Sequence, residues 1–147
     1  MPIGRPGGFL LGLALLGCAA QASSSAAHDF RSQDIRIGHP WAAPATAGTT
    51  EAYVALLNLG SSGDRLVAAG TPGARSARLM DRNGAEVSGG IELPPGRGVS
   101  LRPGGSHVRL EGLERPLRPG DRFPLTLRFA RTPEVTVDVI VEDAPAH

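Results

Sequence analysis

The stretch SLRPGGSHVRLEGLERPLRPGD, residues 100–121, places one short segment between two turns. The first turn contains Gly104-Gly105, and the second is rich in Pro and Gly, which are the residues that most often interrupt regular structure. Between them, residues 107–113 alternate between apolar and polar side chains, as a half-buried β-strand does. His107 begins this strand, and Arg109 lies two positions later on the same face. From this pattern alone, His107 is equally open to two interpretations: a metal ligand, or a polar residue leaving a turn.

The same pattern continues on both sides of this stretch. Short apolar or alternating segments are separated by Gly and Pro turns, and Asn83-Gly84 is a strong hairpin signal. No helical period runs beyond two turns. About eight or nine strands at regular spacing predict an all-β sandwich or Greek-key barrel with a single core. The expected strands are residues 34–39, 51–59, 64–69, 76–80, 91–93, 99–103, 107–113, 122–130 and 134–142.

The N-terminal segment predicts export. Residues 1–22 combine a basic start with a short apolar run, as in a secretory signal peptide. Two cleavage sites compete: Ala20-Gln21-Ala22 suits ordinary signal peptidase and is favoured, whereas LLGC (residues 15–18) resembles a lipobox. The second would leave Cys18 as a lipid anchor in the membrane. We therefore expect a periplasmic or secreted protein, or a membrane-anchored lipoprotein. It comprises a flexible linker at 23–33, a folded domain at 34–143 and a tail at 144–147.

Composition excludes several classes of function. The formal net charge is +1 with interspersed signs, and the chain has four Phe, one Tyr and one Trp, so neither a nucleic-acid surface nor an anionic-membrane patch is expected. Cys18 is the sole cysteine, which excludes disulfides within the chain, thiolate zinc sites and blue-copper sites. There is no nucleophile elbow and no phosphate-binding loop of P-loop or Rossmann type, so an enzyme is not expected.

The candidate metal donors of the expected domain are His39, Met80 and His107. Imidazole and thioether ligands suit Cu(I). Met80 is the only Met after the initiator, and it ends a strand just before the expected hairpin, where a ligand would be exposed. Without further information, a gap-filling core residue is the favoured interpretation of Met80. His39 precedes Pro40-Trp41, and a structural edge position suits it better than a ligand role.

Three segments together resemble the periplasmic copper chaperone PCu(A)C family. They are HPWAAPATAGTTEAYVALLNLGSSGDRLVAA (residues 39–69), LRPGGSHVRLEGLERPLRPGDRFPLTLRF (101–129) and EVTVDVIV (134–141). The resemblance implies a cupredoxin-like Greek-key β-sandwich. It also implies binding of Cu(I), and in some members Cu(II), with delivery to the copper centre of cytochrome oxidase through its assembly partners.

The resemblance also implies a reduced set of copper ligands. The family uses a His before the hairpin, a Met about ten residues later, and a His-x-Met after the Gly-Gly turn. In this chain His107 matches the His of the last motif, Arg109 occupies its Met position, Met80 stands where the first His is expected, and the other Met has no counterpart. We therefore expect a Cu(I) carrier with His107 and Met80 as ligands. The alternative is a metal-free relative that serves as an envelope binding or scaffold module, with Arg109 and His107 forming an anion- or partner-binding patch.

Overall fold

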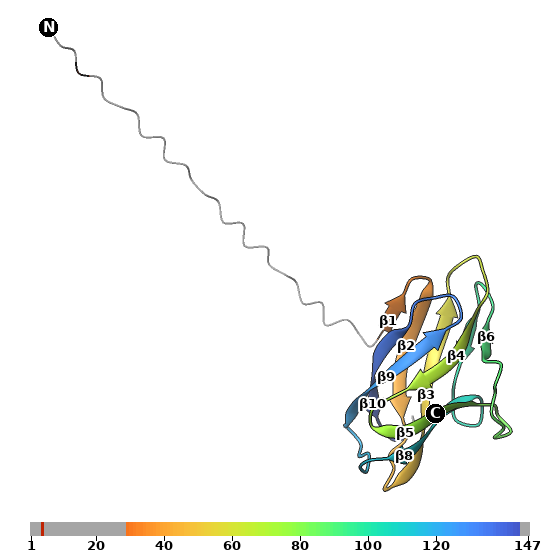
Figure 1. Ribbon diagram of the computed structural model, residues 1–147, viewed down its shortest axis with the longest axis vertical. Coiled ribbons are helices and arrows are strands. Elements are labelled where there is room, and N and C mark those ends of the chain that lie inside the picture. The colour runs from red at the N-terminus through yellow and green to blue at the C-terminus, as the bar shows by residue number, and fades with distance from the viewer. Residues whose placement is uncertain (1–3, 5–28, 145–147) are drawn as a thin grey trace.

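The computed structural model describes residue 4 and residues 29–144, which fold into strands without a helix (Figure 1). Among these residues no helix is long and apolar enough to cross a membrane. The strands are β1 (Asp29–Ser32), β2 (Ile35–Ala42), β3 (Gly48–Asn58), β4 (Asp64–Gly70), β5 (Ala74–Met80), β6 (Ile91–Leu93), β7 (Gly98–Ser100), β8 (His107–Leu113), β9 (Arg122–Phe129) and β10 (Val135–Val141).

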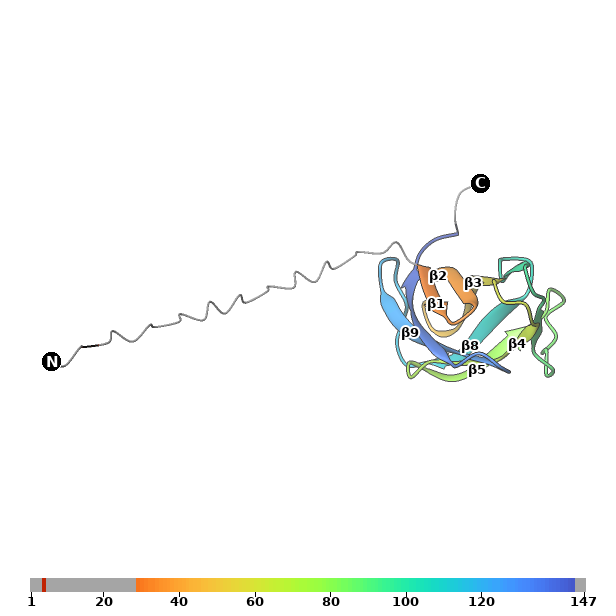
Figure 2. The same ribbon diagram turned by 90° about the horizontal axis from the view of Figure 1, so that it is seen from above.

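The strands form one strongly curled sheet. Its order is β5-β8-β3-β2-β10-β9-β4-β6, with β1 added beside β2 and β7 added beside β3. Seen from above, the sheet wraps around a central core as a nearly closed barrel or sandwich (Figure 2). All the pairings are antiparallel except that of β10 with β2, where Ile140 lies opposite Trp41. The predicted all-β sandwich is therefore confirmed.

Alternation of side chains builds the core. Val137, Val139 and Val141 of β10 are essentially buried, while Asp138 between them is exposed, as a period of two requires. β9 contributes Leu125 and Leu127 in the same way. Burial of a Val or Leu side chain contributes roughly 1.5–3 kcal/mol, so these inward faces are the main source of stability. The inner residues of the strands that carry the candidate site are Ala52, Val54, Leu56, Leu79, Val108 and Leu110.

Two turns that the sequence predicts are present next to the candidate site. Asn83-Gly84 lies in the connection after β5, where Gly84 has φ 78° and Asp81 Oδ1 accepts hydrogen bonds from the Asn83 and Ala85 N–H groups. Gly104 has φ 76°, a value that favours glycine, and the Gly105 N–H donates to the Arg102 carbonyl in the turn before β8. Both turns therefore place strand ends at one region of the sheet.

Strand β1 differs from the sequence-based expectation of a flexible linker at residues 23–33. Its four residues pair antiparallel with β2, from Asp29 opposite Gly38 to Ser32 opposite Ile35. A tight turn makes this possible, and Gln33 has φ 50° in it. The pairing uses backbone groups, which explains why the polar sequence DFRS gave little signal. The predicted signal peptide, Cys18, His28 and His147 lie outside the described residues.

Candidate functional site

A row of four side chains crosses the sheet at the level where β8 begins. Met80 on β5 lies directly opposite His107 on β8, and Trp41 on β2 lies directly opposite Tyr53 on β3. Ala52 pairs with Val108, which places Tyr53 beside His107, and their ring centroids are 6.5 Å apart. The Trp41 and Tyr53 rings are 4.6 Å apart. All four side chains are buried. The strand alternation places them on the face opposite the main hydrophobic core.

The thioether of Met80 lies within reach of the His107 side chain. Directly opposed residues in an antiparallel pair have Cβ atoms about 5 Å apart, well within the length of a Met side chain. Only 5% of Met80 is accessible, which agrees with the gap-filling interpretation that the residue type alone favoured and not with an exposed ligand at the strand end. The chain after Met80 turns back, and a bridge between Met80 and Glu86 covers the strand end. The buried Met80 nevertheless lies on the other face from Leu79, which belongs to the core.

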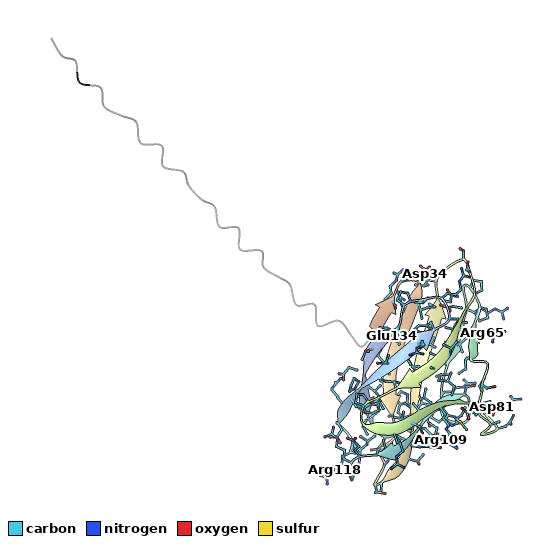
Figure 3. The ribbon with its side chains drawn as sticks, viewed as in Figure 1. Asp34, Arg65, Asp81, Arg109, Arg118 and Glu134 are labelled. Atoms are coloured by element: carbon cyan, nitrogen blue, oxygen red, sulfur yellow. The ribbon has the colours of Figure 1, made fainter. Side chains whose placement is uncertain are left out.

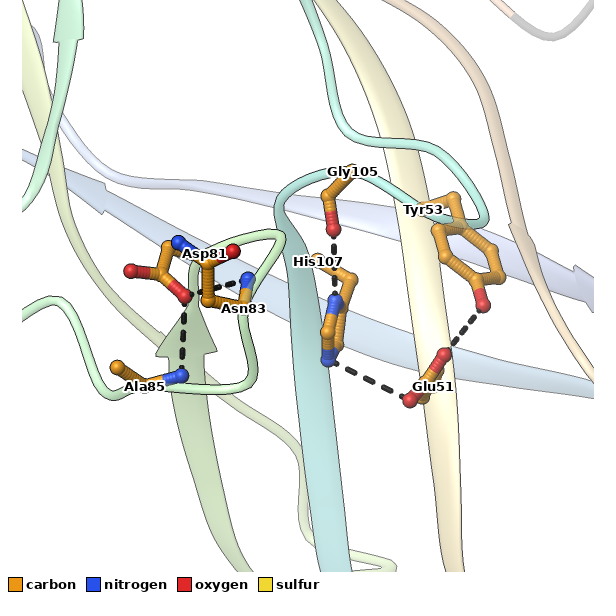
Figure 4. Close-up of polar contacts among 7 residues, drawn as sticks. All are labelled: Glu51, Tyr53, Asp81, Asn83, Ala85, Gly105 and His107. Atoms are coloured by element: carbon orange, nitrogen blue, oxygen red, sulfur yellow. Dashed lines mark hydrogen bonds and ion pairs between the residues drawn. The ribbon is translucent and has the colours of Figure 1, made fainter.

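The His107 ring is held from one side only. Its Nδ1 lies 3.0 Å from the Gly105 carbonyl oxygen, and because a carbonyl only accepts, Nδ1 carries the hydrogen (Figure 4). In the neutral imidazole this leaves the lone pair on Nε2. The Nε2 atom is buried and has no hydrogen-bond partner. Its nearest charged neighbour is Glu51 Oε1 at 3.4 Å, which is within ion-pair range but long for a hydrogen bond.

Glu51 is fixed by a second contact. The Tyr53 hydroxyl donates to Glu51 Oε2 at 2.6 Å, which leaves Oε1 facing His107 (Figure 4). Burial, this hydrogen bond and the Glu51 charge together hold the pKa of the Tyr53 hydroxyl well above its ordinary value, so it remains a donor at neutral pH. The Glu51 side chain is 38% exposed, whereas that of His107 is only 9% exposed. Glu51 therefore stands between the buried imidazole and solvent.

Arg109 lies on the same strand face as His107, as predicted. Its cross-strand neighbours are Glu51 on β3 and Arg78 on β5. Arg78 approaches Glu86 at 3.7 Å, but within the described part of the chain no hydrogen bond or ion pair joins Arg109 to another side chain. Figure 3 shows Arg109 in the lower half of the domain, where β5 and β8 run side by side. A fixed cation therefore stands near the His107 position.

His39 is not brought to this row. It lies at a bulge between Gly38 and Trp41 with φ 42°, and its exposed ring contacts Glu142 Oε1 at 2.5 Å through Nε2. The bulge turns His39 outward while it places Trp41 beside Tyr53. The structural role predicted for His39 agrees with this geometry, although β2 lies inside the sheet between β3 and β10 and is not an edge strand.

A groove of about 390 Å³ lies beside Asp64, and this carboxylate is the other buried acid of note. Burial alone would raise its pKa, but hydrogen bonds from the Thr132 hydroxyl and from the N–H groups of Arg65, Thr132 and Arg131 lower it below the ordinary value. These contacts range from 2.6 to 3.0 Å. The Asp64 oxygens are thus fully engaged in joining β4 to the turn after β9, and the other acid that lines the groove, Glu92, is exposed and pairs with Arg65 at 2.8 Å.

The row and the adjacent Glu51 together offer one imidazole nitrogen without a hydrogen-bond partner, one carboxylate oxygen and one thioether. Within the residues that the structure describes, no three His, Cys, Asp or Glu side chains gather around one point, so Met80 is needed for a third donor. Nothing in the sequence alone singles out Glu51 and Tyr53. Their relation to His107 depends on the pairing of β3 with β8, which joins residues more than fifty positions apart.

Comparison with known proteins identifies the family of this chain. The family model described as "Putative lipoprotein LpqE-like" matches residues 35–141. A curated protein from Leifsonia xyli subsp. xyli (strain CTCB07), described as "Putative lipoprotein Lxx21020", is 34% identical over 139 residues. The alignment covers 89% of this chain and 84% of that protein.

Solved structures that are similar to this chain include PCuAC domains. The copper-bound PCuAC domain from PmoF2 is 32% identical with a TM-score of 0.73, over 80% of this chain and 99% of that domain. The apo PCuAC domain from PmoF1 is 30% identical with a TM-score of 0.72, over 80% and 100%. The Cu(I) form of DR1885 from Deinococcus radiodurans is 26% identical with a TM-score of 0.61, over 83% and 85%. This chain therefore belongs to the LpqE-like family and has the fold of the PCuAC copper-binding domains.

Proposed function

We propose that this protein is a copper chaperone-like carrier that binds Cu(I) through His107 and Met80. The observation that carries the proposal is the buried His107 Nε2, which has no hydrogen-bond partner and lies on the strand directly opposite Met80. A buried polar atom without a partner is costly, and a bound cation would satisfy it. One imidazole and one thioether form a soft donor pair suited to Cu(I). The copper-bound state of the PmoF2 domain and the Cu(I) state of DR1885 support copper as the cargo.

The place of action that we propose is outside the cytoplasm. The export signal in residues 1–22 supports this location, and so do the lipoprotein descriptions of the family and of the Leifsonia relative. These descriptions also favour cleavage before Cys18, which would anchor the carrier to the membrane. The acceptor that we propose is an envelope copper protein such as the copper centre of cytochrome oxidase.

A Cu(I) competition titration against a chromogenic chelator tests the proposal. We expect one Cu(I) per chain, with binding abolished in His107→Ala and weakened at least tenfold in Met80→Leu, because Leu retains the apolar volume but removes the sulfur donor. Trp41 is the only Trp, and its ring packs against Tyr53 next to His107, so its fluorescence gives a second readout. His39→Ala is the matched control, since His39 lies outside the row, and it should bind as the unmodified protein does.

Unchanged Cu(I) affinity in both His107→Ala and Met80→Leu would reject these ligands. The choice of Leu matters, because Met80 is buried and Met80→Ala would lower the free energy of unfolding by about 2–5 kcal/mol through the cavity alone. Loss of binding in Met80→Ala would therefore not distinguish a missing ligand from a damaged fold.

A metal-free binding module is the second candidate, and one observation favours it. Arg109 lies directly opposite Arg78 across the β5–β8 pair, and like charges in this position destabilise a sheet unless an anion lies between them. An anionic partner group at Arg78 and Arg109 would relieve this repulsion. Absence of Cu(I) and Cu(II) binding, together with phosphate-dependent stabilisation that Arg109→Leu abolishes, would establish this candidate in place of the carrier.

A further inference from the structure

The His107 imidazole has a second neighbour with donor character, on the side away from Met80. In the sheet order β5-β8-β3, His107 stands between the thioether on β5 and the Glu51 carboxylate on β3. Oε1 of Glu51 is 3.4 Å from Nε2 of His107. With the hydrogen of the neutral ring on Nδ1, both atoms present lone pairs to each other. Such a pair is stabilised by a cation placed between them.

The spacing of the two atoms fits a metal ion. Bonds from a divalent metal to imidazole nitrogen and carboxylate oxygen are about 2.0–2.2 Å long. Cu(II) with such donors prefers angles of about 90° between neighbouring bonds, and two such bonds then separate the nitrogen and the oxygen by about 3 Å. The separation of Glu51 Oε1 and His107 Nε2 is 3.4 Å, so the partly exposed Glu51 carboxylate needs to move only about half an ångström toward Nε2.

Both side chains are held in this orientation by contacts on their far atoms. The Gly105 carbonyl accepts from Nδ1 of His107, and the Tyr53 hydroxyl donates to Oε2 of Glu51. Contacts of this kind to the remote atoms of ligands orient metal sites in general. The Glu51 side chain is also the more exposed of the two, which gives an ion a route from solvent to the buried nitrogen.

We propose that Glu51 is a third metal-binding side chain, and that Glu51 with His107 forms a Cu(II)-binding pair. Nitrogen and oxygen donors suit Cu(II), whereas the thioether of Met80 suits Cu(I). The two donor pairs share the single Nε2 atom, so one ion is bound at a time. Arg109 is the neighbour of Glu51 across the β3–β8 pair. The negative charge of Glu51 offsets the positive charge of Arg109, which reduces the repulsion that a metal ion beside His107 would experience. This inference rests on the proposed function in taking copper as the cargo.

Separate titrations of the purified protein with Cu(II) and with Cu(I) test the role of Glu51. We expect Glu51→Gln to weaken Cu(II) binding at least tenfold, since even loss of a group that only orients a ligand costs ten- to a hundredfold. The Cu(II) electron paramagnetic resonance spectrum should change at the same time, because a charged carboxylate donor is replaced by a neutral amide. Cu(I) affinity should fall less, by about fivefold, because Glu51 contributes only its charge to an ion whose donors are His107 and Met80.

Glu111→Gln is the matched control, because Glu111 is a half-buried acid on the same strand face as His107 but lies opposite Thr49 and Ser76. A loss of Cu(II) affinity in Glu51→Gln no larger than in Glu111→Gln would overturn the inference. An equal loss for Cu(I) and Cu(II) would overturn the division between the two donor pairs.

The two proposals fail in different ways. Cu(I) binding that depends on His107 and Met80, with Cu(II) binding insensitive to Glu51→Gln, would remove the Glu51 inference and keep the Cu(I) carrier. Cu(II) binding that depends on Glu51 and His107, without measurable Cu(I) binding, would keep the inference and remove the Cu(I) carrier.

Discussion

Tyr53 is the residue whose ionisation reports most directly on the candidate site. It is the only Tyr in the chain, and it is buried with its hydroxyl hydrogen-bonded to Glu51. Burial raises the pKa of its hydroxyl, and the hydrogen bond and the negative charge of Glu51 raise it further. The protonated phenol is therefore favoured in the folded state. Its contribution to stability is complete below the unfolded pKa of about 10 and is lost as the pH rises through the higher folded value.

We therefore expect no tyrosinate absorbance in the folded protein until well above pH 10. Glu51→Gln should move the transition to lower pH, because the amide removes the neighbouring negative charge. The measurement is ultraviolet absorbance against pH, with circular dichroism to confirm that the sheet remains folded. Tyrosinate that forms near its ordinary pKa in folded protein would contradict the hydrogen bond between Tyr53 and Glu51.

At the scale of single elements, the β5–β8 pair sets the electrostatics of the site. Arg109 places a permanent positive charge on the face that carries His107. We expect Arg109→Leu to strengthen Cu(I) binding by roughly 1 kcal/mol, about fivefold, because a repulsion between two cations is removed. Arg109→Met should strengthen it further, since it adds a thioether on the same face.

The control for these two variants is Arg115→Leu, which removes an equal charge from the exposed loop after β8. Affinities measured against the same chelator separate a local effect from a change in net charge. Equal affinity in Arg109→Leu and Arg115→Leu would show that Arg109 does not act on the metal position.

The strands themselves could be predicted from the sequence, whereas the site could be predicted only in part. Alternation such as that of Val137, Asp138 and Val139 reflects burial of one face, and that signal is local. Strand β1 was not predicted, because its four residues are held by backbone pairing with β2 and their side chains give no clear strand pattern. The role of Glu51 was not predicted either, because its proximity to His107 depends on the register of β3 against β8, which no local pattern encodes. The burial of Met80 agrees with the gap-filling interpretation, but the fold-back of the following hairpin that covers it is not encoded by a local pattern.

At the scale of the whole molecule, Asp64 connects segments that are far apart in the chain. Its carboxylate accepts four hydrogen bonds, three of which come from Arg131 and Thr132 at the turn between β9 and β10. Its pKa in the folded state is lowered. Its contribution to stability is therefore complete above the unfolded pKa of about 4 and is lost as the pH falls through the lower folded value.

Urea unfolding between pH 7 and pH 3 should show this contribution. We expect the free energy of unfolding to fall below about pH 4, and Asp64→Asn to lower it at neutral pH and to flatten its decline in acid. Asp138→Asn is the control, because Asp138 forms only an exposed pair with Arg122 and should change little. A decline in acid that is equally steep in Asp64→Asn would mean that other carboxylates dominate it.

The parallel pairing of β10 with β2 also determines when the fold can form. The two strands lie about a hundred positions apart, so the sheet cannot close until nearly the whole domain is available. A topology dominated by such distant pairings folds slowly, on the order of milliseconds to seconds. A chain emerging from an export channel would thus remain open until its last strand arrived. The proposed copper ligands Glu51, Met80 and His107 lie on β3, β5 and β8, so they meet only after these three strands have come into register.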